Sequence, residues 1–352
     1  MADPVIARPK PCLVKLERGR TYFWCACGRS ALQPFCDGSH RGTGLGPRKL
    51  VAGRSEEVLL CGCKRSCGAP FCDGAHTNLP GGSPLDDPES PANRLIPVVA
   101  AQDGPRRWLN DGCYVVSPAL APKDSRERLR YCYLVTPELG ARFQTQVLLE
   151  VRDGASPVLS WGVRDAILLV AAGSGRAIIS GREFEVKPHD GLYVRPGEGL
   201  QLLPAGRETL SVFALVSPQG ELEWPAAMPH NFDASFPERV ASVAPGQRTA
   251  MGPRYFQLLV DKRLGSRTIT QFIGHIPRSK AAPHRHLYEE ALIVLAGKGC
   301  IWTEDRKARV EAGEVVFLPR RQLHSLEATS AEGMLVAGVI CPGDNPSIAY
   351  YD

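Results

Sequence analysis

Residues 291–321 read ALIVLAGKGCIWTEDRKARVEAGEVVFLPRR, and this pattern determines what the larger part of the chain can be. Short apolar runs alternate with Gly and Pro, which is typical of β-strands joined by tight turns. The earlier stretch 166–199, AILLVAAGSGRAIISGREFEVKPHDGLYVRPGEG, has the same layout, and long helical periodicity is scarce. We therefore predict two copies of one all-β unit, the second starting near residue 235.

Cysteine is concentrated at the other end of the chain. Eight of the 12 cysteines lie in the first 80 of 352 residues. Residues 79–95, LPGGSPLDDPESPANRL, contain four prolines and are typical of a flexible linker. Since a domain has roughly 100–200 residues, the length predicts two or three folded units. We expect a small Cys-rich part, a linker and then the two β-units.

Charge is distributed unevenly. The first 80 residues hold 12 basic and 6 acidic side chains, a net charge of +6, whereas the remainder carries −1 of the total +5. An ordinary solvated surface and a docking face for an acidic redox partner both fit this excess. No nucleic-acid-binding motif accompanies the basic residues, so we expect no nucleic-acid partner.

The apolar runs are too short for a membrane protein. None approaches the ~18 residues that span a bilayer. The start, MADPVIARPKP, lacks the apolar core of a signal peptide. We therefore expect no membrane partner, a cytoplasmic location and reduced cysteines that are available to bind metal.

Two Cys-rich motifs share one spacing, C-x-C, eight residues, C, three residues, H. Their members are Cys25, Cys27, Cys36 and His40 in the first copy and Cys61, Cys63, Cys72 and His76 in the second. An Asp-Gly pair between the third Cys and the His predicts a tight turn that returns the imidazole toward the thiolate. Three thiolates and one imidazole can hold an iron-sulfur centre or a structural zinc ion, and spacing alone leaves both open.

Both motifs resemble the CDGSH iron-sulfur family, whose pattern C-x-C-x2-(S/T)-x3-P-x-C-D-G-(S/A/T)-H each copy matches completely. The resemblance covers about residues 10–78. It implies a [2Fe-2S] cluster in each motif, held by the eight residues named above. Tandem copies in one chain are similar to the monomeric branch of that family.

A third group of ligand-type residues lies in the second β-unit, where residues 284–290 read HRHLYEE. Alternate residues of a strand share a face, so His284, His286, Tyr288 and Glu290 are expected to point the same way. His324 follows near a later turn. Because buried imidazoles and a carboxylate need a metal to offset their desolvation, we predict a metal site.

Residues 278–328 resemble the cupin family and its motifs G-x5-H-x-H-x3,4-E-x6-G and G-x5-P-x-G-x2-H-x3-N. The resemblance implies a β-barrel with His284, His286, Glu290 and His324 as metal ligands. The departures from the motifs are Arg278, Arg321 and Ala328. Tyr288 is interpreted as a hydrogen-bond donor beside the ligands or as barrel packing. Arg321, with Arg320, either clamps a substrate carboxylate or belongs to an exposed turn.

The earlier β-unit lacks these ligands. Counted from Gly173 and Pro196, the equivalent positions are Ser160, Gly162, Ala166 and Gln201, which cannot bind a metal in the same way. The predicted fold class is mostly β: two small CDGSH iron-sulfur modules followed by two cupin (double-stranded β-helix, jelly-roll) barrels. The expected units are module 1 at 1–47, module 2 at 48–78, a linker at 79–105, a metal-free cupin at 106–232 and a metal-binding cupin at 233–352.

Function does not follow from the cupin fold, which hosts dioxygenases, decarboxylases, isomerases and metal-free binders. The cluster motifs favour an oxygenase among these classes, because an isomerase needs no electrons whereas a non-haem iron site that reacts with O₂ does. We expect an oxygenase with Fe(II) that acts on a small organic substrate with O₂. Two [2Fe-2S] clusters would supply electrons from an external reductase or ferredoxin, and the cupin barrels would form a homodimer.

Several alternatives stay open. Mn, Ni, Cu or Zn also suit three His and one Glu. The chain is also compatible with a redox or iron-sulfur sensor whose cupin binds an effector. A third interpretation is a cluster-transfer protein whose cupin is a separate metal-dependent isomerase or decarboxylase.

Overall fold

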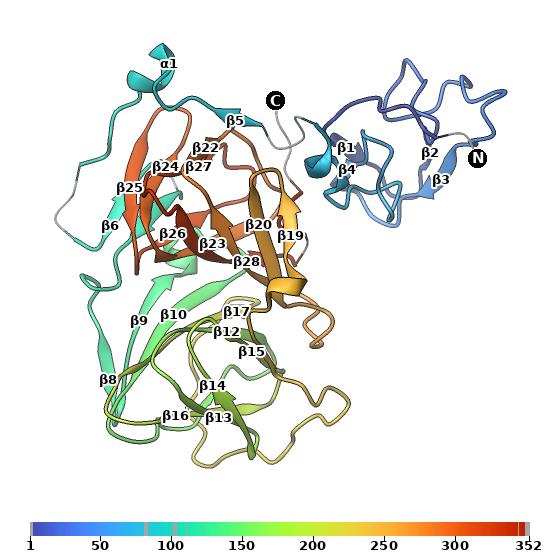
Figure 1. Ribbon diagram of the computed structural model, residues 1–352. Helices are drawn as coiled ribbons and strands as arrows, with labels where there is room; N and C mark the ends of the chain where they lie inside the picture. Colours follow the sequence, from blue (N-terminus) through green and yellow to red (C-terminus); the bar gives the residue numbers. More distant parts are fainter. Residues whose placement is uncertain (1–2, 81–83, 101–103, 111, 344, 349–352) are drawn as a thin grey trace.

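The computed structural model describes residues 3–80, 84–100, 104–110, 112–343 and 345–348. The protein is mostly β, as predicted, with a small N-terminal lobe beside two barrels (Figure 1). Within the described ranges, no helix has the length and apolar character needed to cross a membrane.

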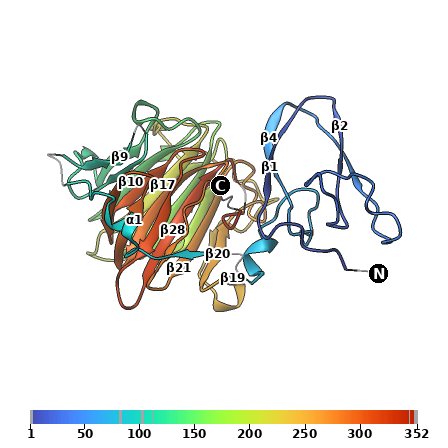
Figure 2. The same cartoon turned by 90° about the horizontal axis from the view of Figure 1, so that it is seen from above.

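The N-terminal lobe is built on two strand pairs that cross the predicted module boundary. Its elements are β1 (Cys12–Leu16), β2 (Thr21–Trp24), β3 (Arg48–Val51), β4 (Glu56–Leu60) and the 3-10 turn η1 (Ala75–Asn78). β1 pairs with β4, and β2 pairs with β3. The predicted division between 1–47 and 48–78 therefore separates two ligand motifs but not two independent folding units. In both views the β1–β4 pair lies on the barrel side of the lobe (Figures 1 and 2).

The predicted flexible linker is docked on the second barrel over residues 84–100. β5 (Leu85–Asp86) pairs with β22 (Ser279–Ala281), and α1 (Pro91–Arg94) follows. The buried Lys280 ammonium meets Asp86 at 2.5 Å. The amide of Lys307 donates to the Pro97 carbonyl at 2.9 Å. The proline content predicted mobility, but hydrogen bonds to the barrel edge hold this segment at Pro84, Pro97 and Val99.

The first barrel consists of a seven-stranded sheet, β18-β15-β12-β17-β10-β9-β8, facing a four-stranded one, β11-β16-β13-β14. Its elements are β8 (Asp124–Arg126), β9 (Leu129–Val135), η2 (Pro137–Leu139), β10 (Thr145–Val151), β11 (Leu159–Ser160), β12 (Asp165–Ala172), β13 (Gly175–Ile179), β14 (Arg182–Val186), β15 (Gly191–Val194), β16 (Gly199–Pro204), β17 (Leu210–Ser217) and β18 (Val240–Ala241). Buried Leu, Val and Ile side chains fill the interior.

The second barrel pairs an eight-stranded sheet, β19-β20-β21-β28-β23-β26-β7-β6, with a five-stranded one, β25-β24-β27-β22-β5. Its remaining elements are β6 (Arg106–Trp108), β7 (Tyr114–Val116), η3 (Pro245–Gln247), β19 (Thr249–Met251), β20 (Arg254–Val260), β21 (Thr270–Ile276), β23 (Glu289–Ala296), β24 (Lys298–Trp302), β25 (Lys307–Glu311), β26 (Val315–Leu318), β27 (Ser325–Ala328) and β28 (Met334–Cys341).

The two barrels exchange strands at the predicted boundaries. β6 and β7, expected in the first barrel, extend the sheet of the second through the pairing of β7 with β26. β18, expected in the second barrel, pairs with β15 of the first. A shared apolar core that includes Tyr114, Leu215 and Phe317 joins the large sheets. Figure 2 shows β10, β17 and β28 side by side across this body.

Candidate functional site

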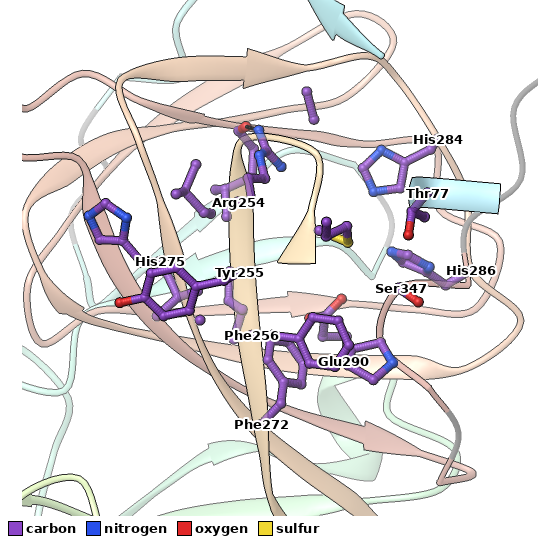
Figure 3. Close-up of a pocket in the computed structure, with 18 of the residues that line it drawn as sticks. Thr77, Arg254, Tyr255, Phe256, Phe272, His275, His284, His286, Glu290 and Ser347 are labelled. Carbon is purple, nitrogen blue, oxygen red and sulfur yellow. Dashed lines mark hydrogen bonds between the residues drawn. The ribbon is translucent and has the colours of Figure 1, made fainter. Parts of the chain in front are cut away.

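Three imidazoles come together at one end of the second barrel. His284 and His286 follow β22, and His324 directly precedes β27. An isolated β-bridge joins the backbones of His284 and His324. One ring nitrogen from each of the three residues lies within 4.8 Å of the other two. The prediction of converging histidines is thus realised in the geometry, and Figure 3 shows His284 and His286 beside the cavity.

Backbone carbonyls orient all three rings. The Nδ1 atoms of His284, His286 and His324 lie 2.8, 3.0 and 2.9 Å from the carbonyl oxygens of Ala282, Ile348 and Gln322. A carbonyl oxygen only accepts, so each Nδ1 carries the proton and each Nε2 keeps a lone pair. Three lone pairs on neighbouring rings are the donor set of a metal site with open positions.

Burial keeps these imidazoles neutral. It lowers the pKa of His286 to about 3 and that of His324 to about 4, and it holds the pKa of His284 well below its usual range. The neighbouring imidazoles contribute to the shifts of His284 and His286 because two positive charges at this distance repel each other. A neutral ring is the form that ligates a metal.

Glu290, the fourth predicted ligand, lies on β23 and lines the same cavity as the histidines. It is not one of the three residues whose ligand atoms gather within 4.8 Å. Burial raises the pKa of this carboxyl to about 7. Without a bound cation, a large fraction of Glu290 is therefore protonated at neutral pH.

Tyr288 and Arg321 contact the site in different ways. The Tyr288 ring stacks on His286 with centroids 4.6 Å apart and an interplanar angle of 11°. Its hydroxyl donates to the Pro346 carbonyl at 3.3 Å. Arg321 is absent from the cavity wall; its guanidinium forms an ion pair with Glu57 on β4, and its amide donates to the His286 carbonyl. The expectation that Arg321 clamps a substrate thus has no support in its position.

The cavity beside the histidines is mostly apolar. Its wall includes Phe256, Phe272, Leu292, Ile301, Leu318, Leu326 and Val336. Arg254 and Tyr255 on β20 add polar groups, and Figure 3 shows both beside it. Sequence reasoning missed these two residues, since they belong to no motif. His275 also lines the cavity, and its ring stacks on Tyr255 with centroids 5.6 Å apart.

The first cluster motif brings its predicted ligands together in two pairs. Cys25 Sγ and Cys27 Sγ are 3.7 Å apart, and Cys36 Sγ lies 3.1 Å from His40 Nδ1. Cys36 is close enough to contribute to a raised pKa of the Cys27 thiol, although burial is the larger cause. The Asp37 carboxylate accepts the amides of Ala31 and Ser39 and fixes the turn.

The second motif repeats this geometry. Cys61 Sγ and Cys63 Sγ are 3.6 Å apart, and Cys72 Sγ lies 3.4 Å from His76 Nδ1. Asp73 accepts the amides of Cys67 and Ala75. Gathered thiols with an imidazole aimed at them fit a metal-sulfur centre in each copy.

The two cluster motifs differ in burial. The His76 side chain is 1% exposed and its Nε2 makes no hydrogen bond, whereas His40 is only half-buried. Burial lowers the pKa of His76 to about 4, which keeps the ring neutral for ligation.

A direct contact links the motifs to each other. The indole of Trp24, the residue before Cys25, donates to the Cys61 carbonyl at 3.0 Å. The buried Lys64 ammonium donates to the same carbonyl at 3.1 Å and lies 4.5 Å from the centre of the Trp24 ring. A buried cation between two thiolate sites partly offsets their negative charge.

Among the residues that the structure describes, the first barrel contains no comparable site. Ala166 pairs with Val216 as Glu290 pairs with Ile340, so Ala166 stands where predicted. The strand register corrects the fourth position. Gly175 and Gly299 occupy equivalent positions in the two barrels, and they pair with Pro204 and Ala328. Four residues before these partners stand Leu200 and His324. Leu200, not Gln201, is therefore at the position of His324. The turn after Pro196 is one residue shorter than the turn after Pro319. Leu200 is fully buried in the apolar core.

Comparisons with known proteins agree with both parts of the chain. A cupin-domain family model matches residues 275–341, and a model described as iron-binding zinc finger, CDGSH type, matches residues 6–41. CDGSH iron-sulfur domain-containing protein 3, mitochondrial, of Mus musculus and of Homo sapiens is 55% identical over 53 residues. Those residues are 14% of this chain and 39% and 42% of the two relatives, so the chain spans about two fifths of their length.

Several solved structures have a fold similar to that of this chain. Protein Ylba from E. coli superposes with a TM-score of 0.53 and 17% identity, covering 69% of this chain and 96% of that one. Oxalate decarboxylase from Lactobacillus farciminis, in a formate complex, has a TM-score of 0.51 and 15% identity over 65% of this chain and 86% of its own. At these identities the similarity establishes the fold alone.

Proposed function

We propose that this chain, with a CDGSH iron-sulfur domain at its N-terminus and a cupin domain at its C-terminus, is a metal-dependent cupin oxygenase. It would use Fe(II) at the histidines, a small organic substrate and O₂, with electrons from two [2Fe-2S] clusters. The observation that carries the proposal is that Thr77, next to the cluster ligand His76, lines the same cavity as His284. A redox centre beside a three-histidine pocket suits a reaction that consumes electrons.

The residues of the pocket would have different roles in the reaction. His284, His286 and His324 would hold the metal through their Nε2 atoms, and the metal would supply one-electron chemistry toward O₂. Glu290 would ligate as a carboxylate or hold a proton at its carboxyl oxygen, since its pKa is raised to about 7. The apolar wall excludes water from the hydrocarbon part of a substrate. Arg254 would bind a carboxylate at the cavity edge.

Reoxidation of the clusters by O₂ tests the proposal. The full chain is reduced anaerobically, with the cupin site either loaded with iron or filled with Zn²⁺, and mixed with O₂ in a stopped-flow instrument. We expect the cluster absorbance to return faster in the iron-loaded protein. His324→Ala should abolish the difference, and Gln201→Ala, in the first barrel, should preserve it. Equal rates with iron and with zinc would refute electron supply.

The partial exposure of His40 favours a second candidate, transfer of the first cluster to another protein. An apo-ferredoxin acceptor incubated with the cluster-loaded chain tests it. Appearance of holo-ferredoxin together with equal reoxidation rates would support transfer over oxygenation.

A further inference from the structure

Residues 345–348 contact the ligand loop of the second cluster motif. The Asn345 side-chain amide donates to the Asp73 carbonyl at 2.8 Å. Asn345 Oδ1 in turn accepts the amide and the hydroxyl of Ser347 at 2.9 and 2.8 Å, which fixes the serine. Ser347 packs so closely on Gly74 that a Cβ added to the glycine would lie 1.9 Å from Ser347 Oγ.

The same four residues contact the histidine site. His286 Nδ1–H donates to the Ile348 carbonyl, and the Tyr288 hydroxyl donates to the Pro346 carbonyl. The Ile348 side chain packs with Leu59, and Cys72 packs against this apolar cluster. Ile348 therefore contacts a metal-site imidazole with its carbonyl, and its side chain belongs to the apolar cluster against which the ligand Cys72 packs.

We propose that residues 345–348 form a strap that holds the second cluster site against the histidine site, and that the second cluster is the one that exchanges electrons with the metal. This proposal rests on the proposed function. With both groups bound, one electron would pass from the reduced second cluster, which would return to its oxidised state, to the metal, which would go from the trivalent to the divalent state. An external one-electron donor of the ferredoxin class restores the reduced cluster.

The arrangement of the lobe gives the relay a direction. β4, which leads into Cys61, lies on the barrel side, and β2, which leads into Cys25, lies on the far side (Figures 1 and 2). The first cluster would therefore meet the external donor. The hydrogen bond from Trp24 to the Cys61 carbonyl would connect the first site to the second.

The chain offers a matched pair of variants. Gly38 and Gly74 occupy the same place in their motifs and have left-handed φ values of 96° and 87°. A Cβ at Gly38 meets nothing within 4 Å, whereas a Cβ at Gly74 collides with the strap. Gly38→Ala and Gly74→Ala therefore carry similar backbone strain and differ in their effect on the strap. Iron and sulfide analysis confirms that each variant holds both clusters.

Magnetic coupling between the sites is the readout, so the test needs no turnover. The full chain, with reduced clusters, carries paramagnetic Co²⁺ or diamagnetic Zn²⁺ in the histidine site. His40→Cys, which alters the EPR signal of the first cluster, assigns the two signals. We expect Co²⁺ to broaden the second cluster's signal, Gly74→Ala to lose the broadening, and Gly38→Ala to keep it.

Several results would overturn the strap. They are broadening of the first cluster's signal alone, equal broadening of both signals, and the same behaviour of the two glycine variants. If Gly74→Ala fails to hold its cluster, the Asn345→Ala variant is used in its place, because this substitution removes the hydrogen bond to Asp73 without straining the turn. In Asn345→Ala the broadening of the second cluster's signal by Co²⁺ should weaken, and unchanged broadening would count against the proposal. Broadening without faster reoxidation by O₂ would retain the strap and reject the oxygenase.

Discussion

The two barrels share one architecture and differ in what fills the position of the histidine site. In the second barrel three imidazoles, each with Nδ1 beside a backbone carbonyl, line a mostly apolar cavity. In the first, Ser160, Gly162, Ala166 and Leu200 occupy the corresponding places. Leu200 joins a continuous apolar core there. The barrel itself therefore does not require the site, and the histidines serve the ligand rather than the fold.

The largest expected effect separates packing from ligation. Leu200→Ala should destabilise the protein by about 2–5 kcal/mol, because it leaves a cavity in a close-packed core. Urea unfolding of the metal-free chain measures the change. His324→Ala, at the equivalent place, should cost clearly less in the same assay. Equal costs would mean that both positions serve packing.

Metal binding should show the opposite pattern. His324→Ala removes one of three nitrogen donors, and we expect the Zn²⁺ affinity to fall at least about hundredfold. Mutation of a residue that only supports a ligand already costs up to about hundredfold, and loss of a ligand should cost no less. Titration calorimetry on cluster-loaded protein measures it. Leu200→Ala should bind Zn²⁺ at the histidine site as the parent chain does. An unchanged affinity in His324→Ala would place the metal elsewhere.

Acid should destabilise the metal-free second barrel through its histidines. The folded-state pKa values of His286 and His324 are about 3 and about 4. The unfolded rings bind a proton below about pH 6.5, so unfolding takes up protons and becomes easier as the pH falls from 6.5 toward 4. Each ring contributes a slope of up to about 1.4 kcal/mol per pH unit. Urea unfolding at several pH values should show a shallower slope in His324→Gln.

Glu290 should change the stability with pH in the direction opposite to that of the histidines. Its folded-state pKa is raised to about 7, so the folded state binds the extra proton between pH 4.5 and 7, and stability falls as the pH rises through that range. Glu290→Gln should steepen the acid destabilisation. A slope unaffected by either substitution would contradict the burial of these groups.

The smallest expected effect concerns Tyr288. Tyr288→Phe keeps the ring stacked on His286 and removes the hydrogen bond to the Pro346 carbonyl, worth about 1 kcal/mol. We expect less than a tenfold loss of Zn²⁺ affinity by calorimetry. Tyr288→Ala, which also removes the stacking, should lose more. If the Phe variant matched the Ala variant, the hydroxyl rather than the ring would position His286.

The sequence predicted the local chemistry well, because short spacing constrains geometry strongly. The separation of four residues between Cys36 and His40 fits a single turn. His284 and His286 lie outside the strands, between β22 and β23, and both line the cavity. His284, His286 and His324 gather as one group and Glu290 lines the same cavity, whereas each cysteine motif brings its four ligands together as a Cys–Cys pair and a Cys–His pair.

Long-range contacts were the part that sequence could not provide. Arg321 follows the barrel motif in sequence but pairs with Glu57, 264 positions earlier in the chain. Arg254 reaches the cavity from a strand with no motif, and Thr77 reaches it from another lobe. Neither spacing nor periodicity carries information on which surfaces dock, because docking depends on the shapes of both partners.

In the N-terminal lobe each strand of the first copy pairs with a strand of the second, so the two copies cannot fold separately. A chain cut between residues 47 and 48 would leave β1 and β2 without their partners β4 and β3. Each fragment would then present open strand edges, which favour aggregation. The duplication has thus produced one folding unit with two ligand sets, and deleting either copy is expected to remove both.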